Sequence, residues 1–298
     1  MIKNYDFLKH TQLFSDVKNI VDIDKISENK LKITSKLGKD YVFAYYDIKD
    51  HEAIEREQFI QGRLEDIGLV PLRIYEEGIM PDINKAYKIF EYRQEISLGE
   101  FLRENSNSEC RNIGIAFGKV LKDFHQVKPT EAVDWEKKFL TKSNYLFYIH
   151  GLSEDIGEND YILIDYIEAN IHLTKNTPIN LMHGKINEKN IRIYDNNKLD
   201  LRGIKDISYG DGVFDFVDIN KLALYSEEFA RGVLEGYFEG NKPSRKFFRL
   251  LSLYQAYTIL YNKVDSNSKK GHSLNEKEIK QILEMYDYFN ELLPEWSR

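Results

Sequence analysis

The stretch LMHGKINEKN, residues 181–190, decides how this chain is interpreted. Two apolar residues lead into His183 and Gly184, a lysine follows at position 185, and the stretch ends at Asn190. The residues after it, IRIYDNNKLDLRGIKDI, alternate apolar and polar side chains around DNN, which is typical of short strands joined by a tight hairpin. The pattern therefore predicts a polar loop that presents a histidine, a lysine and an asparagine next to short strands.

The residues on the N-terminal side of this loop predict a sheet with one helix. Apolar and polar residues alternate in 31–34 and 40–48, with SKLGK as the turn, and two further strands are expected within 69–93, with PDIN between them. Between these pairs, residues 49–68 have a helical repeat formed by Ala53, Glu57, Ile60, Leu64 and Ile67. We therefore expect about five antiparallel strands and one helix that carries Glu57 among its apolar positions.

The remainder of the chain is mainly helical. One apolar helix face is expected in 107–127, and residues 133–175 are expected to be helical or irregular. Ser226 is expected to cap a helix, another helix is expected from Pro243 to Val264, and NEKE, at 275–278, matches a capping box. The fold class is thus α+β, with a smaller unit at 1–93 and a larger helical unit at 94–298 that contains the loop region 181–215.

Composition narrows the class of protein. The chain has 298 residues, of which 42% are hydrophobic, so it is long enough to bury a full core. Its net charge of -7 argues against nucleic acid as the partner, because phosphate backbones attract a surplus of Lys and Arg. A single cysteine, Cys110, excludes an internal disulfide. No secretory signal and no run of about 18 apolar residues is present, so we expect a cytoplasmic protein without a membrane partner.

The spaced motifs resemble those of the aminoglycoside phosphotransferase and choline kinase family, which has a bilobal fold related to the protein kinases. The family's catalytic loop is HGDxxxxN, and here His183-Gly184-Lys185 is followed by Asn190 at the same spacing. Asp206 follows 16 residues later in GIKDI, at the place of the family's magnesium-binding Asp. GDGVFD, residues 210–215, resembles the next motif of the family, and DFH, residues 123–125, resembles its Leu-His pair.

The resemblance assigns roles to residues of this chain. It makes Asn190 and Asp206 the magnesium ligands, His183 a structural histidine that braces the loop, and Glu57, Glu91 and Tyr92 nucleotide-binding residues. Phosphoryl transfer in this fold also uses a cation on the third strand and an acid that engages the attacking hydroxyl. Ala44 stands at the position of that cation, and Lys185 stands at the position of the catalytic acid. Two parts of the machinery are therefore missing.

Both departures leave alternatives open. Glu57 has no cation at position 44 to pair with, so either it faces solvent or Lys30, Lys32 or Lys39 on neighbouring strands replaces that partner. Lys185 either pairs with Asp206 and neutralises the magnesium site, or it binds an anion directly. In the first case a metal-bridged nucleotide is repelled, so binding of ATP or GTP with magnesium is expected to be weak or absent.

Three functions remain. The first is a pseudo-phosphotransferase whose cleft holds a small-molecule or anionic ligand and which acts through a protein partner. The second is an active ATP- or GTP-dependent kinase with rearranged residues that phosphorylates an aminoglycoside, a choline-like compound or a sugar. The third is a different nucleotide reaction, such as nucleotidyl transfer. The missing acid and the missing cation favour the first function.

Overall fold

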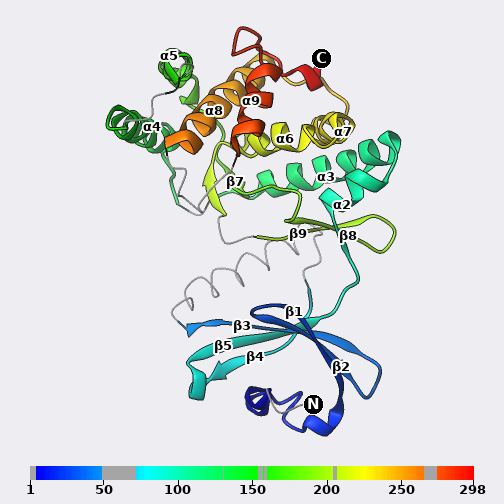
Figure 1. Ribbon diagram of the computed structural model, residues 1–298. Helices are drawn as coiled ribbons and strands as arrows, with labels where there is room; N and C mark the ends of the chain where they lie inside the picture. The colour runs from blue at the N-terminus through cyan, green and yellow to red at the C-terminus, as the bar shows by residue number, and fades with distance from the viewer. Residues whose placement is uncertain are drawn as a thin grey trace. The chain divides into compact units, whose positions relative to one another are not determined.

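A computed structural model of the chain describes residues 5–48, 72–129, 131–153, 157, 160–203, 207–264 and 274–298. The chain divides into two compact units, Met1–Glu95 and Ile96–Arg298. The first unit contains an antiparallel sheet, and the second is mainly helical (Figure 1). This architecture confirms the α+β fold class that the sequence predicts.

The sheet of the first unit has the strand order β1-β2-β3-β5-β4, and each neighbouring pair is antiparallel. The strands are β1 (Ile20–Ser27), β2 (Lys30–Ser35), β3 (Asp40–Asp47), β4 (Ile74–Met80) and β5 (Lys85–Glu91). Gly38 takes a φ of +71° in the turn predicted at SKLGK, and PDIN forms the short helix η4 (Pro81–Ile83) followed by Asn84 at a φ of +52°. The predicted strands are confirmed, whereas the helix predicted at 49–68 lies outside the described residues.

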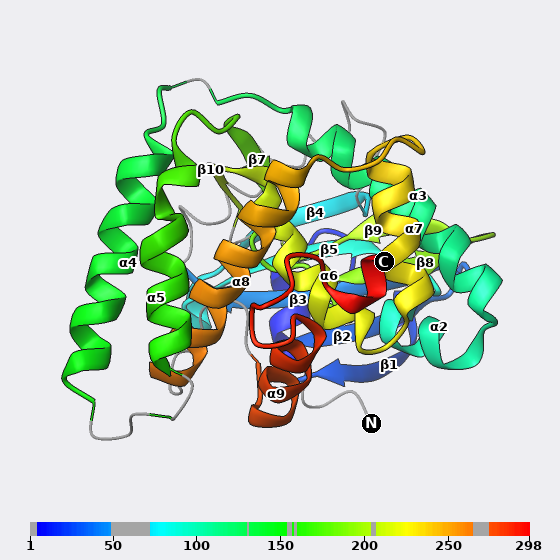
Figure 2. The ribbon, with the colours of Figure 1, turned by 90° about the horizontal axis from the view of Figure 1, so that it is seen from above.

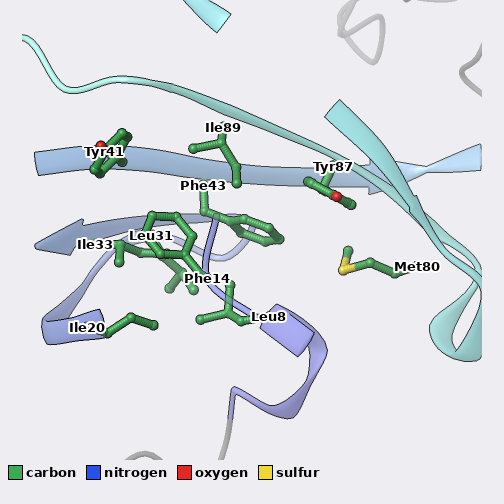
Figure 3. Packing of buried hydrophobic residues seen from close by; sticks show 10 residues of the cluster. All are labelled: Leu8, Phe14, Ile20, Leu31, Ile33, Tyr41, Phe43, Met80, Tyr87 and Ile89. Carbon is green, nitrogen blue, oxygen red and sulfur yellow. The ribbon is translucent and has the colours of Figure 1, made fainter. Parts of the chain in front are cut away.

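One face of this sheet carries the hydrophobic core of the first unit. Alternate residues of β3 and β5, among them Phe43 and Tyr87, point into it, and these two rings stack with their centroids 5.5 Å apart. The N-terminal segment covers this face: Leu8 of η1 (Asp6–His10) and Phe14 pack against the strands (Figure 3). The residues that alternate with these core residues along β3 and β5, such as Ala44 and Lys88, consequently point to the opposite face of the sheet.

The second unit is built of helices, and side-chain caps fix the starts of several of them. They are α2 (Leu98–Glu104), α3 (Asn107–Gln126), α4 (Trp135–Gly151), α5 (Asp160–Asn170), α6 (Phe216–Ala223), α7 (Glu227–Tyr237), α8 (Arg245–Val264) and α9 (Glu276–Met285). Ser226 accepts a hydrogen bond from the third residue of α7, and Asn275 and Glu278 form a capping box, so both predicted helix starts are confirmed. The helix predicted from Pro243 begins at Arg245 and ends at Val264.

Two contacts organise these helices. α3 and α7 approach so closely that a Cβ added to Gly114 would overlap the carbonyl oxygen of Phe229, and one added to Gly236 would overlap that of Ile115. α8 packs against α4 and α5, and the three helices lie side by side (Figure 2). The middle of α8 is buried on every side, which explains its run of large apolar residues.

Short strands position the loop that the sequence singles out. β7 (Asn180–Met182) pairs with β10 (Ser208–Gly210), and β6 (Ile96–Ser97), β8 (Ile191–Tyr194) and β9 (Lys198–Leu201) form a second small sheet in the order β6-β8-β9. The turn between β8 and β9 is DNN, as predicted, and all three of its residues have a positive φ. The loop 183–190 therefore runs from one small sheet into the other.

Candidate functional site

The loop between β7 and β8 carries His183, Lys185 and Asn190. Gly184 has a φ of +72°, in the left-handed region that glycine enters without a steric penalty. Ile186, on the other side of Lys185, is fully buried and fixes the middle of the loop to the core of the second unit. Residue 185 therefore lies between a glycine in the left-handed conformation and a fully buried isoleucine.

Asp215, at the end of η7 (Gly212–Asp215), is the main hydrogen-bond acceptor for this loop. Its carboxylate accepts from the backbone N–H groups of His183 and Gly184 at 2.7 and 2.8 Å. His125, near the end of α3, donates a further hydrogen bond from Nε2 at 3.1 Å. Because Asp215 is completely buried, these donors replace the water that its charge has lost.

Two opposing effects set the pKa of Asp215. Burial alone would raise this pKa, because it penalises the charged form, but the hydrogen bond and electrostatic attraction of His125, with help from His183 and the N–H of Gly184, outweigh burial. The pKa of Asp215 therefore lies below its ordinary value. Its negative charge holds the loop and is not available to accept a proton from a substrate.

Two neighbouring carboxylates are engaged in a similar way. Asp218, in α6, accepts a hydrogen bond from the N–H of Ile186 at 2.6 Å. Asp211 accepts from the hydroxyl of Tyr254 at 2.8 Å and from the N–H of Val213 at 3.0 Å. Burial raises the pKa of Asp211 in spite of these hydrogen bonds. The acids that follow the loop in sequence thus hold backbone and side chains in place.

Asn190 closes the other end of the loop. Its Nδ2 donates to the carbonyl oxygen of Lys185 at 2.9 Å, and its own carbonyl oxygen accepts from the N–H of Arg202 at 2.7 Å. Gly203 has a φ of +82°, and a Cβ added there would lie 2.5 Å from Nδ2 of Asn190. A glycine is therefore required beside Asn190 if its side chain is to reach Lys185.

His183 binds the loop from its N-terminal side. Its Nε2 lies 2.9 Å from the carbonyl oxygen of Arg202, which only accepts, so Nε2 donates. Nδ1 is then free to accept from the N–H of Lys185, at 3.3 Å. The N–H and the C=O of Lys185 are both bound by loop side chains, which fixes its backbone whatever side chain it carries.

The side chain of Lys185 is half-buried and brings a positive charge to this position. An ammonium group has three donors and no acceptor, so it cannot take a proton from an attacking hydroxyl. The carboxylates that bind the loop, Asp215 and Asp218, already accept backbone hydrogen bonds. Chemically, residue 185 can attract an anion but cannot act as a base.

The first unit holds the position expected for the strand cation. Ala44 on β3 is buried, and its neighbours in register are Lys30 on β2 and Lys88 on β5. Lys32 is paired with Asp40 at 2.9 Å, and the ammonium of Lys39 lies 4.2 Å from the ring centre of Tyr75. The hydrogen bond that Lys32 donates to Asp40 raises the pKa of Lys32. Both lysines are thus held at the β2–β3 end of the sheet.

The residues expected to bind nucleotide at the end of β5 have local partners. Glu91 forms an ion pair with Arg93. The ring of Tyr92 lies 4.5 Å from the ammonium of Lys32, and its N–H donates to the carbonyl oxygen of Asp40 at 3.3 Å. These contacts tie the end of β5 to the start of β3.

The remaining predicted site residues, Glu57 and Asp206, lie outside the described residues. In the part of the chain that the structure describes, no group of three or more His, Cys, Asp or Glu residues is arranged to hold a metal ion. Of the two expected magnesium ligands, Asn190 is described, and its Nδ2 is turned to Lys185. No helix within the described ranges is long and apolar enough to span a membrane.

Sequence reasoning missed two groups of residues. The motifs DFH and GDGVFD contain His125 and Asp215 but do not reveal that these residues, together with Asp218, hold the loop. The second group is the buried Lys88. The signal for it was present, because strand alternation in KAYKIFEYR puts Lys88 on the same side as Ala86 and Phe90, where an apolar residue is expected.

Comparisons with known proteins agree with this fold. A family model described as the phosphotransferase enzyme family matches residues 21–251. No curated protein sequence matches the chain. The family match and the similar structures confirm the resemblance to aminoglycoside phosphotransferases and choline kinases that the sequence motifs indicate.

Three solved structures are similar over most of their length. The ternary complex of streptomycin, ATP and APH(2'')-IIa has a TM-score of 0.59 at 18% identity, covering 89% of this chain and 92% of that chain. The ADP-bound aminoglycoside phosphotransferase APH(2'')-Ib has a TM-score of 0.58 at 17% identity and covers 99% of both chains. The choline kinase LicA from Streptococcus pneumoniae has a TM-score of 0.55 at 12% identity, covering 90% of this chain and 93% of that chain. At these identities the likeness shows the fold.

Proposed function

Because the chain belongs to the phosphotransferase enzyme family, we propose that it is a pseudo-phosphotransferase, which keeps the family's loop but no longer transfers a phosphoryl group to a hydroxyl. The observation that carries this proposal is the lysine at position 185. Its backbone is bound by His183 and Asn190, and Ile186 beside it is bound by Asp218, so the loop around it is well ordered. The lysine thus stands in a loop whose backbone is held by hydrogen bonds on both sides of it.

The chemistry of the loop supports loss of transfer. In this fold the acid of the catalytic loop engages the hydroxyl that attacks the phosphate. An ammonium group cannot accept that proton, and it also repels a divalent cation from Asn190. Asp215 cannot substitute, because it is completely buried and its lowered pKa reflects hydrogen bonds that hold the loop. We therefore expect ligand to be bound without being consumed.

Magnitudes indicate how complete the loss is. A positioned general base contributes about 10²–10⁴-fold to a rate. A preorganised positive group on developing negative charge contributes about 10²–10³-fold. The position of the strand cation is occupied by Ala44, so both contributions are missing from their family positions. Even with strong non-additivity, a turnover of about 1–100 s⁻¹ would fall by roughly four powers of ten.

An active kinase for a small hydroxyl compound is the second candidate, and one observation favours it. A buried lysine, Lys88, lies opposite Ala44 on the neighbouring strand and supplies a cation close to the expected place. This restores one of the two missing parts. Asp215 and Asp218 do not replace the acid, because both already accept hydrogen bonds from the loop backbone, so the pseudo-phosphotransferase remains the better supported function.

The test is consumption of nucleotide. The purified chain is incubated with ATP or GTP and Mg²⁺, alone and with an aminoglycoside, choline or a sugar as acceptor. We expect no release of ADP or GDP above the buffer rate. Phosphorylated acceptor together with a Mg²⁺-dependent rise in melting temperature would establish the second candidate instead.

A charge reversal at position 185 sharpens this test. Lys185→Asp should create Mg²⁺-dependent stabilisation by ATP, since ligand at 100 times its dissociation constant stabilises the folded state by about 2.7 kcal/mol. Lys189→Asp is the matched control, because Lys189 lies on the same loop, is exposed and undergoes the same change of charge. Equal behaviour of the two variants would show that position 185 has no special relation to the metal.

A further inference from the structure

Lys88, in the middle of β5, is buried, and its ammonium is paired with none of the described residues, although the strand register places Glu77 of β4 next to it. Its side chain is 2% exposed, and within the described ranges its ammonium makes no hydrogen bond or ion pair. The lysines next to it on the sheet behave differently: Lys85 is paired with Asp47 at 2.6 Å, and Lys32 with Asp40 at 2.9 Å. Lys88 is thus the unusual lysine of the described part of this sheet.

The strand register places Lys88 beside the position of the missing cation. The pairing of β3 with β5 sets Lys88 directly opposite Ala44. Tyr87 and Ile89, on either side of Lys88 in sequence, belong to the hydrophobic cluster, so alternation sends Lys88 to the other face together with Ala44. Side chains that face each other in this way start about 4.5–5.5 Å apart.

The two side chains are complementary in size. Ala44 presents only a methyl group, and lysine carries its charge on a flexible four-carbon stem. The methyl group of Ala44 therefore leaves more room for the ammonium of Lys88 than a large side chain at position 44 would. Lys30 flanks Ala44 from the opposite strand, but it is exposed and lies at the end of β2. Of these two neighbours, only Lys88 combines burial with a central place in the sheet.

Energetics argue against a purely structural role for Lys88. A buried charge without a partner destabilises the folded state, and an apolar residue of similar length would fill the same space without that cost. Buried polar groups in folded proteins nearly always have a hydrogen-bond partner, so an exception calls for an explanation. A ligand that brings the missing negative charge provides one.

We propose that Lys88 binds the phosphate groups of a nucleotide, in place of the cation that the family carries on the third strand at position 44. The proposal rests on the proposed function, because it takes the chain to have kept a nucleotide-binding role after losing transfer. An ammonium group is a compact charge with three donors, which suits phosphate oxygens. The cation has moved from β3 to β5 and approaches the same face of the sheet from the adjacent strand.

Binding measurements on the full chain test this inference. Dissociation constants for ATP, ADP, GTP and inorganic tripolyphosphate are measured by calorimetry with and without Mg²⁺, for the wild-type chain and for Lys88→Met. Loss of one hydrogen-bonded charge is expected to weaken binding by about 10- to 100-fold. Lys85→Met, on the same strand but paired with Asp47, is the matched control and should bind as the wild type does.

A transplanted lysine provides the decisive variant. In the double variant Ala44→Lys with Lys88→Met the cation returns to the family position, and nucleotide binding should recover relative to Lys88→Met alone. Lys88→Ala serves as a second removal variant if Lys88→Met does not fold. Wild-type affinity in the removal variants, or the absence of nucleotide and tripolyphosphate binding in the wild-type chain, would overturn the inference.

The outcomes separate this inference from the proposed function. Nucleotide consumption by the wild-type chain would refute the pseudo-phosphotransferase and leave the role of Lys88 intact. Absence of any nucleotide binding would refute the role of Lys88 and leave the loss of transfer intact. The two measurements are made on the same preparation, so each result is assigned to one claim.

Discussion

The loop 183–190 and the sheet face around Ala44 have departed from their family in opposite ways. In the loop the position is kept and the chemistry has changed, because Lys185 sits in an intact frame of hydrogen bonds from His183 and Asn190. On the sheet, with the role proposed for Lys88, the chemistry is kept and the position has changed, because the cation stands on β5 at Lys88, opposite Ala44 of β3.

The difference follows from what holds each region together. The loop is fixed through backbone groups, which do not depend on the identity of residue 185. The sheet is fixed by strand pairing, in which directly opposed residues share one face, so a side chain on either strand reaches the same space. A loop held through its backbone tolerates a new side chain at the same position. A sheet tolerates the transfer of a functional side chain to the directly opposed residue of the adjacent strand.

The most severe way to break this comparison is to remove the support of the loop. Asp215→Asn should destabilise the chain by about 3–5 kcal/mol, as expected when one partner of a buried charged network is removed. The amide replaces one carboxylate oxygen by an NH2 group, which then faces the N–H of either His183 or Gly184 where an acceptor is needed. Urea unfolding of wild type and variant measures the loss.

Asp211→Asn is the matched control for this prediction. Burial raises the pKa of Asp211, so the neutral amide replaces a group that is already costly to ionise, and we expect a loss below about 1 kcal/mol.

The stabilisation by Asp215 should also depend on pH. Because the pKa of Asp215 is lowered on folding, its contribution is present above the unfolded pKa near 3.9 and is lost as the pH falls below that value. The difference between wild type and Asp215→Asn should therefore shrink in acid.

A pair of glycines compares the two regions directly. Gly203→Ala should cost about 2–4 kcal/mol, since a left-handed residue loses about 1–2 kcal/mol and overpacking against Asn190 adds about 1–3 kcal/mol. Gly38→Ala, in the β2–β3 turn, also has a positive φ, but its new Cβ would meet no heavy atom within 4 Å of it. Only the backbone cost of about 1–2 kcal/mol is then expected. Equal losses would contradict the tight contact at Asn190.

Removal of the buried charge at Lys88 should stabilise the folded chain, whereas the preceding substitutions destabilise it. Without ligand, Lys88→Met is expected to stabilise the chain by about 1 kcal/mol or more, because apolar replacement of a buried charge is often stabilising by about 1–4 kcal/mol. Lys85→Met should change stability by less than about 0.5 kcal/mol, since Lys85 is a surface lysine in an ion pair. Thermal unfolding in nucleotide-free buffer distinguishes the two, and a destabilised Lys88→Met would point to a partner for Lys88 within the chain.

Much of the fold could be predicted from the sequence because its signals are local. Alternation identified β2, β3 and β5, and capping residues located the starts of α7 and α9 within their own first turns. The turn at DNN was equally local, since three short polar residues enter the left-handed region together. Each of these predictions depends on residues only a few positions apart.

The arrangement of the site could be predicted only in part, because it depends on distant residues. Motif spacing identified Lys185 and Asn190, but that Asp215 and His125 meet beneath the loop follows from how η7 packs against α3. The place of Lys88 opposite Ala44 likewise depends on β5 pairing with β3, which the sequence alone does not specify. Strand order and helix packing, which join residues far apart in sequence, were the missing information.

The smallest effect is expected at the residue that gives the loop its unusual character. Lys185→Ala should change the free energy of unfolding by no more than about 0.5 kcal/mol, as for other half-exposed side chains outside the core. The backbone groups of residue 185 keep their bonds to His183 and Asn190 in this variant, so the loop should be unaffected. Urea unfolding of Lys185→Ala and Asp215→Asn in the same experiment measures the smallest and the largest expected change in the free energy of unfolding. A large loss at Lys185 would mean that its ammonium helps to hold the loop, and the contrast between a backbone-held loop and a movable sheet cation would then fail.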